Sequence, residues 1–166
     1  DINIPIGNNQ HMLMPSIEAK ILQALNIQLN ENILVVGSGT GYLSSCASLL
    51  GNKVHSIDID NNFVEISKKN SHQDFLKGNI LYENLDLISN LSIIKKYNII
   101  ILTSSVDDSS LITDHMAEQS RAFIFSGKKT APVKTGFLIK KLKTSGLSRE
   151  YIAETDVSHL IVEKND

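Results

Sequence analysis

The sequence predicts an α/β fold built on an open, mostly parallel sheet, with helices on both faces and an antiparallel strand pair at its C-terminal end. Three observations lead to this fold class. Short apolar strand segments alternate with amphipathic helical segments, a glycine-rich turn joins the first such strand to a helix, and only residues 143–148 separate the last two strand segments. Alternating β–α units give parallel strands, whereas a connection that short leaves no room for a crossover helix.

The first half of the chain alternates helix and strand after an entry loop over residues 1–14, which is rich in turn residues. Pro15 fits the first position of a helix because its missing N–H costs nothing there. Residues 33–36 are wholly apolar, as in a strand buried on both faces. The next expected elements are a helix over Tyr42–Leu50, a strand over Lys53–Asp58 and a helix over Asn61–Asn70 with Phe63 and Ile66 facing inward.

The second half continues the alternation of strand and helix and then ends in two consecutive strands. We expect strands over residues 80–83 and 98–103, a helix over 111–117 and a strand over Arg121–Ser126. Residues 136–142 and 149–155 are both strand-like and should pair antiparallel. The whole of residues 1–166 is the length of one ordinary domain.

Composition narrows the classes of function. A single cysteine, Cys46, forms no internal disulfide, the apolar runs are too short to span a bilayer, and no export signal opens the chain. A formal net charge of −2 disfavours nucleic acid as a partner. The histidines show no metal-ligand spacing with one another or with Cys46; they are His11, His55, His72, His115 and His159. We therefore expect a cytoplasmic monomer with no metal site and no membrane partner.

The strongest local signal is the run Gly37-Ser38-Gly39-Thr40-Gly41, between the first predicted strand and a helix. Glycine there permits a tight turn and close approach of the backbone to a ligand, and the helix N-terminus favours an anionic group. Asp58 ends the next strand, about 20 residues after Gly37, the separation at which a carboxylate holds ribose hydroxyls in nucleotide-binding folds. The sequence therefore predicts a nucleotide-type site at this end of the sheet.

The glycine spacing selects among nucleotide ligands. A dinucleotide fingerprint reads G-x-G-x-x-G, which needs glycine at position 42, where Tyr42 stands. The observed G-x-G-x-G, together with the terminal antiparallel strands, suits S-adenosylmethionine, whose methionine carboxylate takes the place of a phosphate over the loop. The expected ligand is thus a methyl donor.

At this point the chain resembles the protein-L-isoaspartate O-methyltransferase family, and in its opening and late segments a proteobacterial branch of it. The stretches that carry the resemblance are IGNNQHMLMP (6–15), ILVVGSGTGYL (33–43), VHSID (54–58), NILYENLD (79–86), YNIIILTS (97–104) and RAFIFSG (121–127). The resemblance implies a Rossmann-like class I methyltransferase fold. It also implies protein repair by methyl transfer from S-adenosyl-L-methionine to the carboxylate of an isoaspartyl residue, leaving S-adenosyl-L-homocysteine.

The resemblance also implies roles for particular residues. Gly37, Ser38, Gly39, Gly41 and the adjoining Tyr42 would hold the methionine part of the donor. Asp58 would take the ribose, Ile59 would pack on the adenine, and Asp86 would bind its exocyclic amine. Gln10, Met12, Leu13 and Thr103 would line the pocket for methyl transfer. Simpler interpretations stay open: Asp86 as a helix N-cap, Thr103 as a strand cap, and Met12 and Leu13 as ordinary hydrophobic residues.

Some positions depart from the family's pattern. Val35 stands where the family has Glu beside the glycine loop, and Leu13 stands where a substrate-loop Ser is expected. The resemblance further implies an N-terminal helical segment that this sequence does not contain. Two alternatives therefore accompany the expected activity. One is a degenerate member that binds the donor weakly or not at all, and the other is a methyltransferase with a small-molecule or RNA acceptor.

Overall fold

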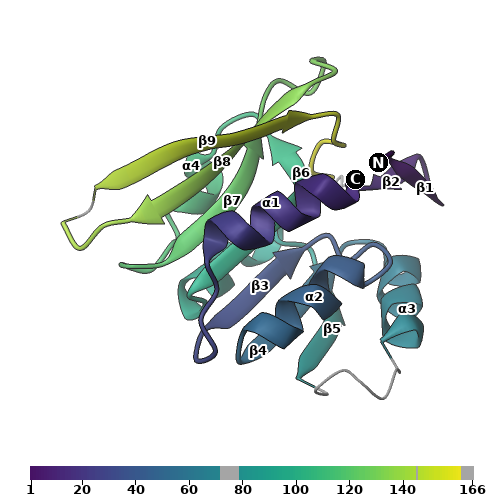
Figure 1. The fold of residues 1–166 in the computed structure, drawn as a ribbon, viewed down its shortest axis with the longest axis horizontal. Helices are drawn as coiled ribbons and strands as arrows, with labels where there is room; N and C mark the ends of the chain where they lie inside the picture. The colour runs from purple at the N-terminus through teal and green to yellow at the C-terminus, as the bar shows by residue number, and fades with distance from the viewer. Residues whose placement is uncertain (72–78, 145, 162–166) are drawn as a thin grey trace.

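The computed structural model describes residues 1–71, 79–144 and 146–161, over which it forms a seven-stranded sheet and a separate two-stranded hairpin (Figure 1). The sheet contains β3 (Asn32–Val36), β4 (Lys53–Asp58), β5 (Ile80–Asn84), β6 (Ile99–Val106), β7 (Arg121–Ser126), β8 (Lys134–Lys141) and β9 (Leu147–Thr155). The hairpin contains β1 (Ile4–Gly7) and β2 (Gln10–Met12). The helices are α1 (Pro15–Leu25), α2 (Tyr42–Leu50), α3 (Asn61–Asn70), α4 (Ser110–Thr113) and the 3₁₀ segment η1 (Ile88–Lys96).

The strand order β5-β4-β3-β6-β7-β8-β9 places the reversal of direction between β3 and β6. From β3 the chain runs outward through β4 to β5, then returns to lay β6 on the other side of β3. These strands and β7 are parallel, whereas β8 runs antiparallel to both β7 and β9. The predicted fold class is confirmed. Ligands of such sheets bind beyond the carboxyl ends of the strands at the reversal, which here means the ends of β3 and β6.

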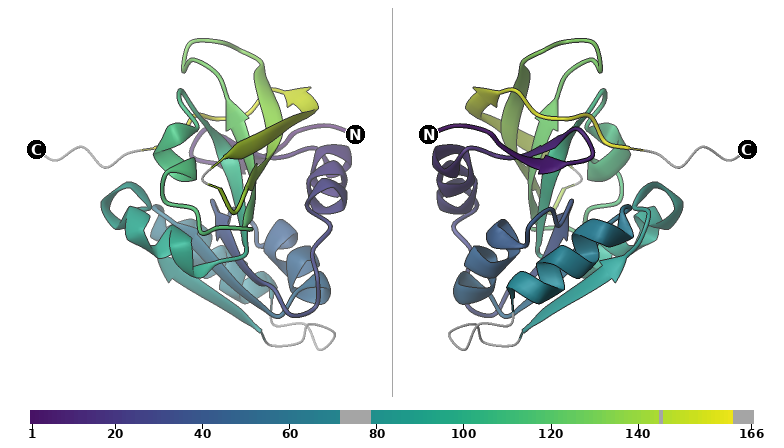
Figure 2. Two further views of the ribbon diagram at one scale, coloured as in Figure 1. Left: turned by 90° about the vertical axis from the view of Figure 1, so that its left-hand side faces the viewer. Right: turned by 90° about the vertical axis from the view of Figure 1, so that its right-hand side faces the viewer.

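Two apolar layers sandwich the sheet because successive side chains of its buried strands point to opposite faces. Ile33 and Val35 join the cluster that also contains Ile17 and Ile21 of α1. Leu34 and Val36 join the opposite cluster, which contains residues of η1 and α4. Figure 2 shows the same arrangement, with α1 and α2 on one side of the sheet and η1 and α4 on the other. The four apolar side chains of β3 are nearly inaccessible to solvent, as expected for the central strand.

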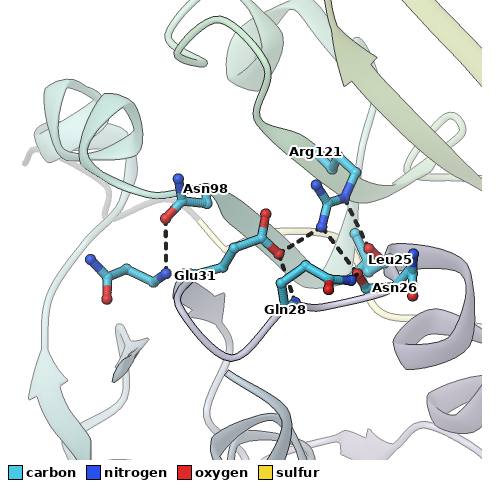
Figure 3. A network of polar contacts seen from close by, with 7 residues as sticks. Leu25, Asn26, Gln28, Glu31, Asn98 and Arg121 are labelled. Atoms are coloured by element: carbon cyan, nitrogen blue, oxygen red, sulfur yellow. Dashed lines mark hydrogen bonds and ion pairs between the residues drawn. The ribbon is translucent and has the colours of Figure 1, made fainter. Parts of the chain in front are cut away.

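A polar network fixes the C-terminal end of α1 to the start of β7 (Figure 3). The Arg121 guanidinium donates to the carbonyls of Leu25 and Asn26, at 2.9 and 3.3 Å, and to the Glu31 carboxylate at 2.7 Å. Glu31 also accepts from the backbone N–H of Gln28 at 2.9 Å. A cation at a helix C-terminus satisfies carbonyls that have no partner within the helix. The network therefore holds α1 in a fixed position over the sheet.

The expectation of an entry loop over residues 1–14 is wrong, because the structure forms the β1–β2 hairpin there. Asn8 and Asn9 both adopt positive φ, 50° and 55°, which is the backbone of a tight two-residue hairpin turn. The hairpin is tied to the rest of the chain through Asn8, whose side-chain amide donates to Asp60 at 2.6 Å, and through Met12, whose sulfur accepts from Thr40 at 3.4 Å. The strands are too short to give a periodic signal in the sequence.

Other expectations need smaller corrections. The bounds expected for α2, β4, α3 and β7 agree with the structure, but α4 is only Ser110–Thr113 and β6 continues to Val106. Ile66 does not face inward, since 39% of it is exposed, and Val64 and Ser67 are buried in its place. The η1 segment was not expected at all. The segment has no regular helical period and has a non-helical backbone at Asn90, so the sequence shows no hydrophobic pattern that would predict it.

Candidate functional site

The glycine loop lies at the β3–β6 reversal and takes a shape that side chains disfavour. Gly37, Gly39 and Gly41 all have positive φ, at 92°, 53° and 84°. A Cβ atom on Gly37 would lie 2.1 Å from Oγ1 of Thr103, which stands on β6. That hydroxyl donates to the carbonyls of Val36 and Gly37, at 3.0 and 3.1 Å. The absence of a side chain at Gly37 thus lets the loop rest directly against Thr103.

Asp58, at the end of β4, organises the same loop from the other side. Its Oδ2 accepts from the Ser38 hydroxyl and the Gly39 backbone N–H, both at 3.2 Å, and its Oδ1 accepts from the Asp60 N–H at 3.0 Å. The residue is only 9% exposed. Because an ionised carboxylate has about four lone-pair positions, Asp58 keeps capacity for further hydroxyl donors from a ligand.

Most of the residues singled out in the sequence meet around one pocket at this end of the sheet. Those that line it are Gln10, Met12, Leu13, Gly37, Ser38, Gly39, Tyr42, Asp58, Ile59, Asp86 and Thr103. Gly41 lies outside the lining and has a packing role instead. It is the left-handed N-cap of α2, and a Cβ there would approach the Tyr82 hydroxyl and Ser67 Cα to 3.0 and 3.1 Å.

Asp86 lines the pocket, and its carboxylate also accepts hydrogen bonds from nearby residues of the chain. One of its oxygens accepts from the N–H of Ile88 at 3.0 Å, and the other accepts from the N–H and hydroxyl of Ser89 at 3.2 and 2.6 Å. These are the first amides of η1, so Asp86 acts as a helix cap. Its carboxylate stays at the rim of the pocket while holding η1 in place.

Residues with no predicted role in the site complete the pocket wall. Ile6, Asn8 and His11 come from the hairpin, which also carries Gln10 and Met12, and residues 157–161 come from the C-terminal part of the described chain. The latter segment is attached to β6 by backbone hydrogen bonds of 2.8 Å between Ser105 and both Ser158 and Leu160. No motif could have found residues 157–161, because backbone pairing and not side-chain type holds them there.

Glu18, on α1, is another lining residue to which the sequence assigned no role. It follows Ile17 on the side of the helix that faces the sheet, and only 6% of it is exposed. Burial raises the pKa of its carboxyl from 4.5 to about 7. The only sequence signal was a charged residue on the apolar face of an amphipathic helix.

The structure contains no cluster of three or more metal-ligating side chains within the described ranges, and His72 lies outside them. No helix among those residues is long and apolar enough to cross a membrane. The polar side chains that line the pocket carry carboxylates, hydroxyls, amides and imidazoles, which suit a polar organic ligand.

Comparison with known families identifies this architecture. The family model described as protein-L-isoaspartate(D-aspartate) O-methyltransferase matches residues 1–119, which include the hairpin, the glycine loop, Asp58, Asp86 and Thr103. The chain belongs to this family. Its resemblance to the family, noted from the sequence motifs, is confirmed.

Two curated relatives extend the match over almost the entire chain. The protein-L-isoaspartate O-methyltransferases of Jannaschia sp. (strain CCS1) and Roseobacter denitrificans are 24% and 26% identical to it, each over 98% of this chain. They are matched over 61% and 64% of their own lengths, so the chain spans somewhat over three-fifths of these relatives.

A solved structure shows the same fold. A crystal structure from Plasmodium falciparum, assigned to a protein-L-isoaspartate O-methyltransferase in complex with S-adenosyl-L-homocysteine, superposes with a TM-score of 0.78. It is 17% identical, and the match covers 97% of this chain and 80% of that one. The Rossmann-like fold expected from the sequence is therefore present here.

Proposed function

We propose that this chain binds S-adenosyl-L-methionine and transfers its methyl group to the carboxylate of isoaspartyl residues in proteins or peptides, as a cytoplasmic monomer. The observation that carries the proposal is the glycine loop held between Thr103 and Asp58 at the sheet reversal, in a chain of this family. The relative with S-adenosyl-L-homocysteine bound supports the same choice of ligand.

The residues of the pocket fit the donor. Gly37 and Gly39 leave the backbone free of side chains where the methionine part would lie, and the Ser38 hydroxyl is engaged with Asp58. Helix α2 begins directly behind this loop. Asp58 offers its remaining lone pairs to the ribose hydroxyls. Ile59, beside Asp58, supplies apolar surface for the adenine ring. Asp86 would meet the adenine amine at the rim, with its carboxylate shared with the cap of η1.

For methyl transfer the protein mainly has to position the donor and the acceptor relative to each other. Bound S-adenosylmethionine supplies an activated methyl group on its sulfonium. An α-carboxylate is ionised at pH 7, so the acceptor needs no general base. What this chain contributes is alignment of the acceptor oxygen with the methyl group and exclusion of water, which together account for large rate effects.

The acceptor end of the pocket is formed by the hairpin and by β6. Gln10 and Leu13, from the hairpin and the turn that follows it, and Thr103, from β6, line it together. Leu13 is 5% exposed and packs in the cluster beneath α1, so it shapes the pocket by its volume and offers no hydrogen bond to a substrate. Gln10, half-buried at the start of β2, is the polar side chain there that can orient a carboxylate.

The test is a methyl-transfer assay with labelled S-adenosylmethionine and two peptides that differ only in having an isoaspartyl or an ordinary aspartyl residue. We expect transfer to the first and not to the second. Donor binding is measured in parallel by calorimetry for the wild type and for Asp58→Asn, which should bind at least about tenfold more weakly because one charged hydrogen-bond acceptor is lost.

Each alternative predicts a different result in the same assays. A degenerate member would show no donor binding at millimolar concentration. A methyltransferase with a small-molecule or RNA acceptor would bind the donor in an Asp58-dependent manner and leave both peptides unmethylated. Either result would contradict the proposal.

A further inference from the structure

Four carboxylate side chains among the described residues line the pocket, and three of them are already engaged. Asp58 accepts from the glycine loop, Asp60 accepts from Asn8 and from the first turn of α3, and Asp86 caps η1. Glu18 differs from all three. Its Oε2 is buried and has no hydrogen-bond partner among the described residues.

An unpartnered buried carboxylate is costly to a folded protein. Charged groups of this kind are normally paired, and leaving one unpaired costs more than an unpaired neutral group. The burial of Glu18 raises its pKa to about 7, which reflects that cost. A buried carboxylate without a partner in a ligand pocket is typical of a group that is paired by the ligand when the ligand binds.

The surroundings of Glu18 determine which end of the donor it can meet. The neighbouring titratable groups are Tyr42 and Cys46 of α2, whose pKa values the Glu18 charge helps to raise. Glu18 therefore lies near the first turns of α2, in the wall of the pocket that Asp58 also lines. A donor with its ribose at Asp58 and its sulfur over the loop extends its methionine end toward α2.

That end of the donor carries two charged groups, a carboxylate and an α-ammonium. The amides at the start of α2 favour the carboxylate. Cationic side chains do not contact Glu18 in the described structure, and β3 offers no carboxylate beside the loop, because Val35 is buried in the apolar cluster under α1. We propose that Glu18 is the anion that receives the α-ammonium of the donor, an inference that rests on the proposed function.

The experiment compares three ligands that differ at this end. S-adenosyl-L-homocysteine has both charged groups, 5′-S-(3-carboxypropyl)-5′-thioadenosine lacks only the ammonium, and 5′-methylthioadenosine lacks the amino-acid end altogether. Calorimetry at pH 8, where Glu18 is ionised, measures their dissociation constants for the wild type, Glu18→Gln and the control Glu150→Gln. Glu150 is an exposed carboxylate on β9, outside the pocket.

We expect Glu18→Gln to weaken S-adenosyl-L-homocysteine binding at least about tenfold, the effect of losing one hydrogen bond between charged groups. The wild type should bind the ligand without ammonium more weakly by a similar factor, and the two losses should not add, because they remove the same interaction. Binding of 5′-methylthioadenosine should be equal in both proteins, which also shows that the variant is folded. Glu150→Gln should behave as the wild type with all three ligands.

Three results would overturn the inference while leaving the donor site intact. They are wild-type affinity of Glu18→Gln for S-adenosyl-L-homocysteine, equal loss of 5′-methylthioadenosine binding in that variant, and equal binding of the ligands with and without the ammonium by the wild type. A wild-type protein that bound neither S-adenosyl-L-homocysteine nor 5′-methylthioadenosine would overturn the proposed function, and this inference with it.

Discussion

At Gly37 a single hydrogen atom in place of a side chain decides whether the loop can lie against β6. Gly37→Ala would put a methyl group 2.1 Å from Thr103 Oγ1 and would keep a backbone with φ of 92° that alanine disfavours. We expect a loss of about 2–4 kcal/mol in the free energy of unfolding and at least tenfold weaker donor binding. Chemical denaturation and calorimetry measure the two effects.

The same geometry supplies a partial rescue of that variant. Thr103→Ala in the Gly37→Ala background removes the Oγ1 atom and leaves the Thr103 Cβ 3.4 Å away, so the collision is relieved while the strain in φ remains. The double variant should therefore recover part of the lost stability. If it is no more stable than Gly37→Ala alone, contact with Thr103 is not the reason that position 37 needs glycine.

Glu18 makes stability depend on pH with a definite sign. Its pKa is about 7 in the folded protein against 4.5 when unfolded, so the folded state binds more protons between these values and stability falls as pH rises through that window. Glu18→Gln removes this cost and should be more stable than the wild type by about 3 kcal/mol at pH 8. The advantage should disappear near pH 4.5.

Denaturant unfolding across pH 4.5–8 measures this difference, with Glu150→Gln as the matched control. Tyr42 and Cys46 face Glu18 but have pKa values raised above their ordinary 10 and 9, so they do not titrate in the window. His11 and His159 also line the pocket and are present in every variant compared. A constant difference between Glu18→Gln and the wild type at all pH values would contradict the assignment.

Among the elements, α1 is held by the Arg121 network at its C-terminal end and by apolar packing along its length, so its contributions to stability and to donor binding can be separated. Arg121→Met removes the donors to the Leu25 and Asn26 carbonyls and leaves the Glu31 carboxylate without its cation. We expect a loss of about 2–4 kcal/mol in unfolding free energy, as for breaking other partly buried ion pairs. Donor affinity should change little, because Ile17, Ile21 and Leu25 still pack α1 on the sheet.

The matched control is Lys140→Met, since Lys140 is the exposed cross-strand partner of Arg121 on β8 and carries the same charge. It should be nearly neutral in stability. Equal effects of the two substitutions would mean that the network at the end of α1 contributes nothing specific.

How far each element could be predicted from the sequence depends on whether local or tertiary contacts define it. Helix α1 begins at a proline, α2 follows a glycine and α3 follows Asp60, which accepts from the Asn62 N–H at 2.9 Å. These signals are local, so the predicted starts of the three helices agreed with the structure. The hairpin, η1 and residues 157–161 lack such signals. They are held by Asn8 to Asp60, by the Asp86 cap and by backbone bonds to Ser105, which no sequence period reveals.

The residues of the candidate site also differ in whether a local sequence pattern or the tertiary structure reveals them. Gly37 and Asp58 were identified because a strand–glycine–helix unit and a carboxylate at a fixed separation form a local pattern. Glu18 could not be identified, since its significance comes from its burial in the pocket wall and from the lack of a hydrogen-bond partner for its Oε2 among the described residues. The sequence showed that Val35 replaces the Glu that the family has beside the glycine loop. Only the structure shows that a different carboxylate, that of Glu18, lines the pocket.

At the scale of the whole molecule, the pocket joins the two ends of the described chain. Its wall takes β1 and β2 from one end and residues 157–161 from the other, and these segments contact the sheet through few hydrogen bonds. Segments of this kind open at low free energy when no ligand is present. A ligand that touches both should therefore order them together.

Hydrogen exchange with and without S-adenosyl-L-homocysteine tests this coupling. At about 100 times the dissociation constant, a ligand stabilises the folded state by about 2.7 kcal/mol, and amides that exchange through the opening of these segments should slow accordingly. We expect slower exchange in residues 4–12 and 157–161 as well as in the glycine loop. The exposed start of β9 at Leu147–Glu150 should not slow by local protection, since it lies outside the pocket. Slowing confined to the glycine loop would mean that the ends of the chain fold independently of the donor.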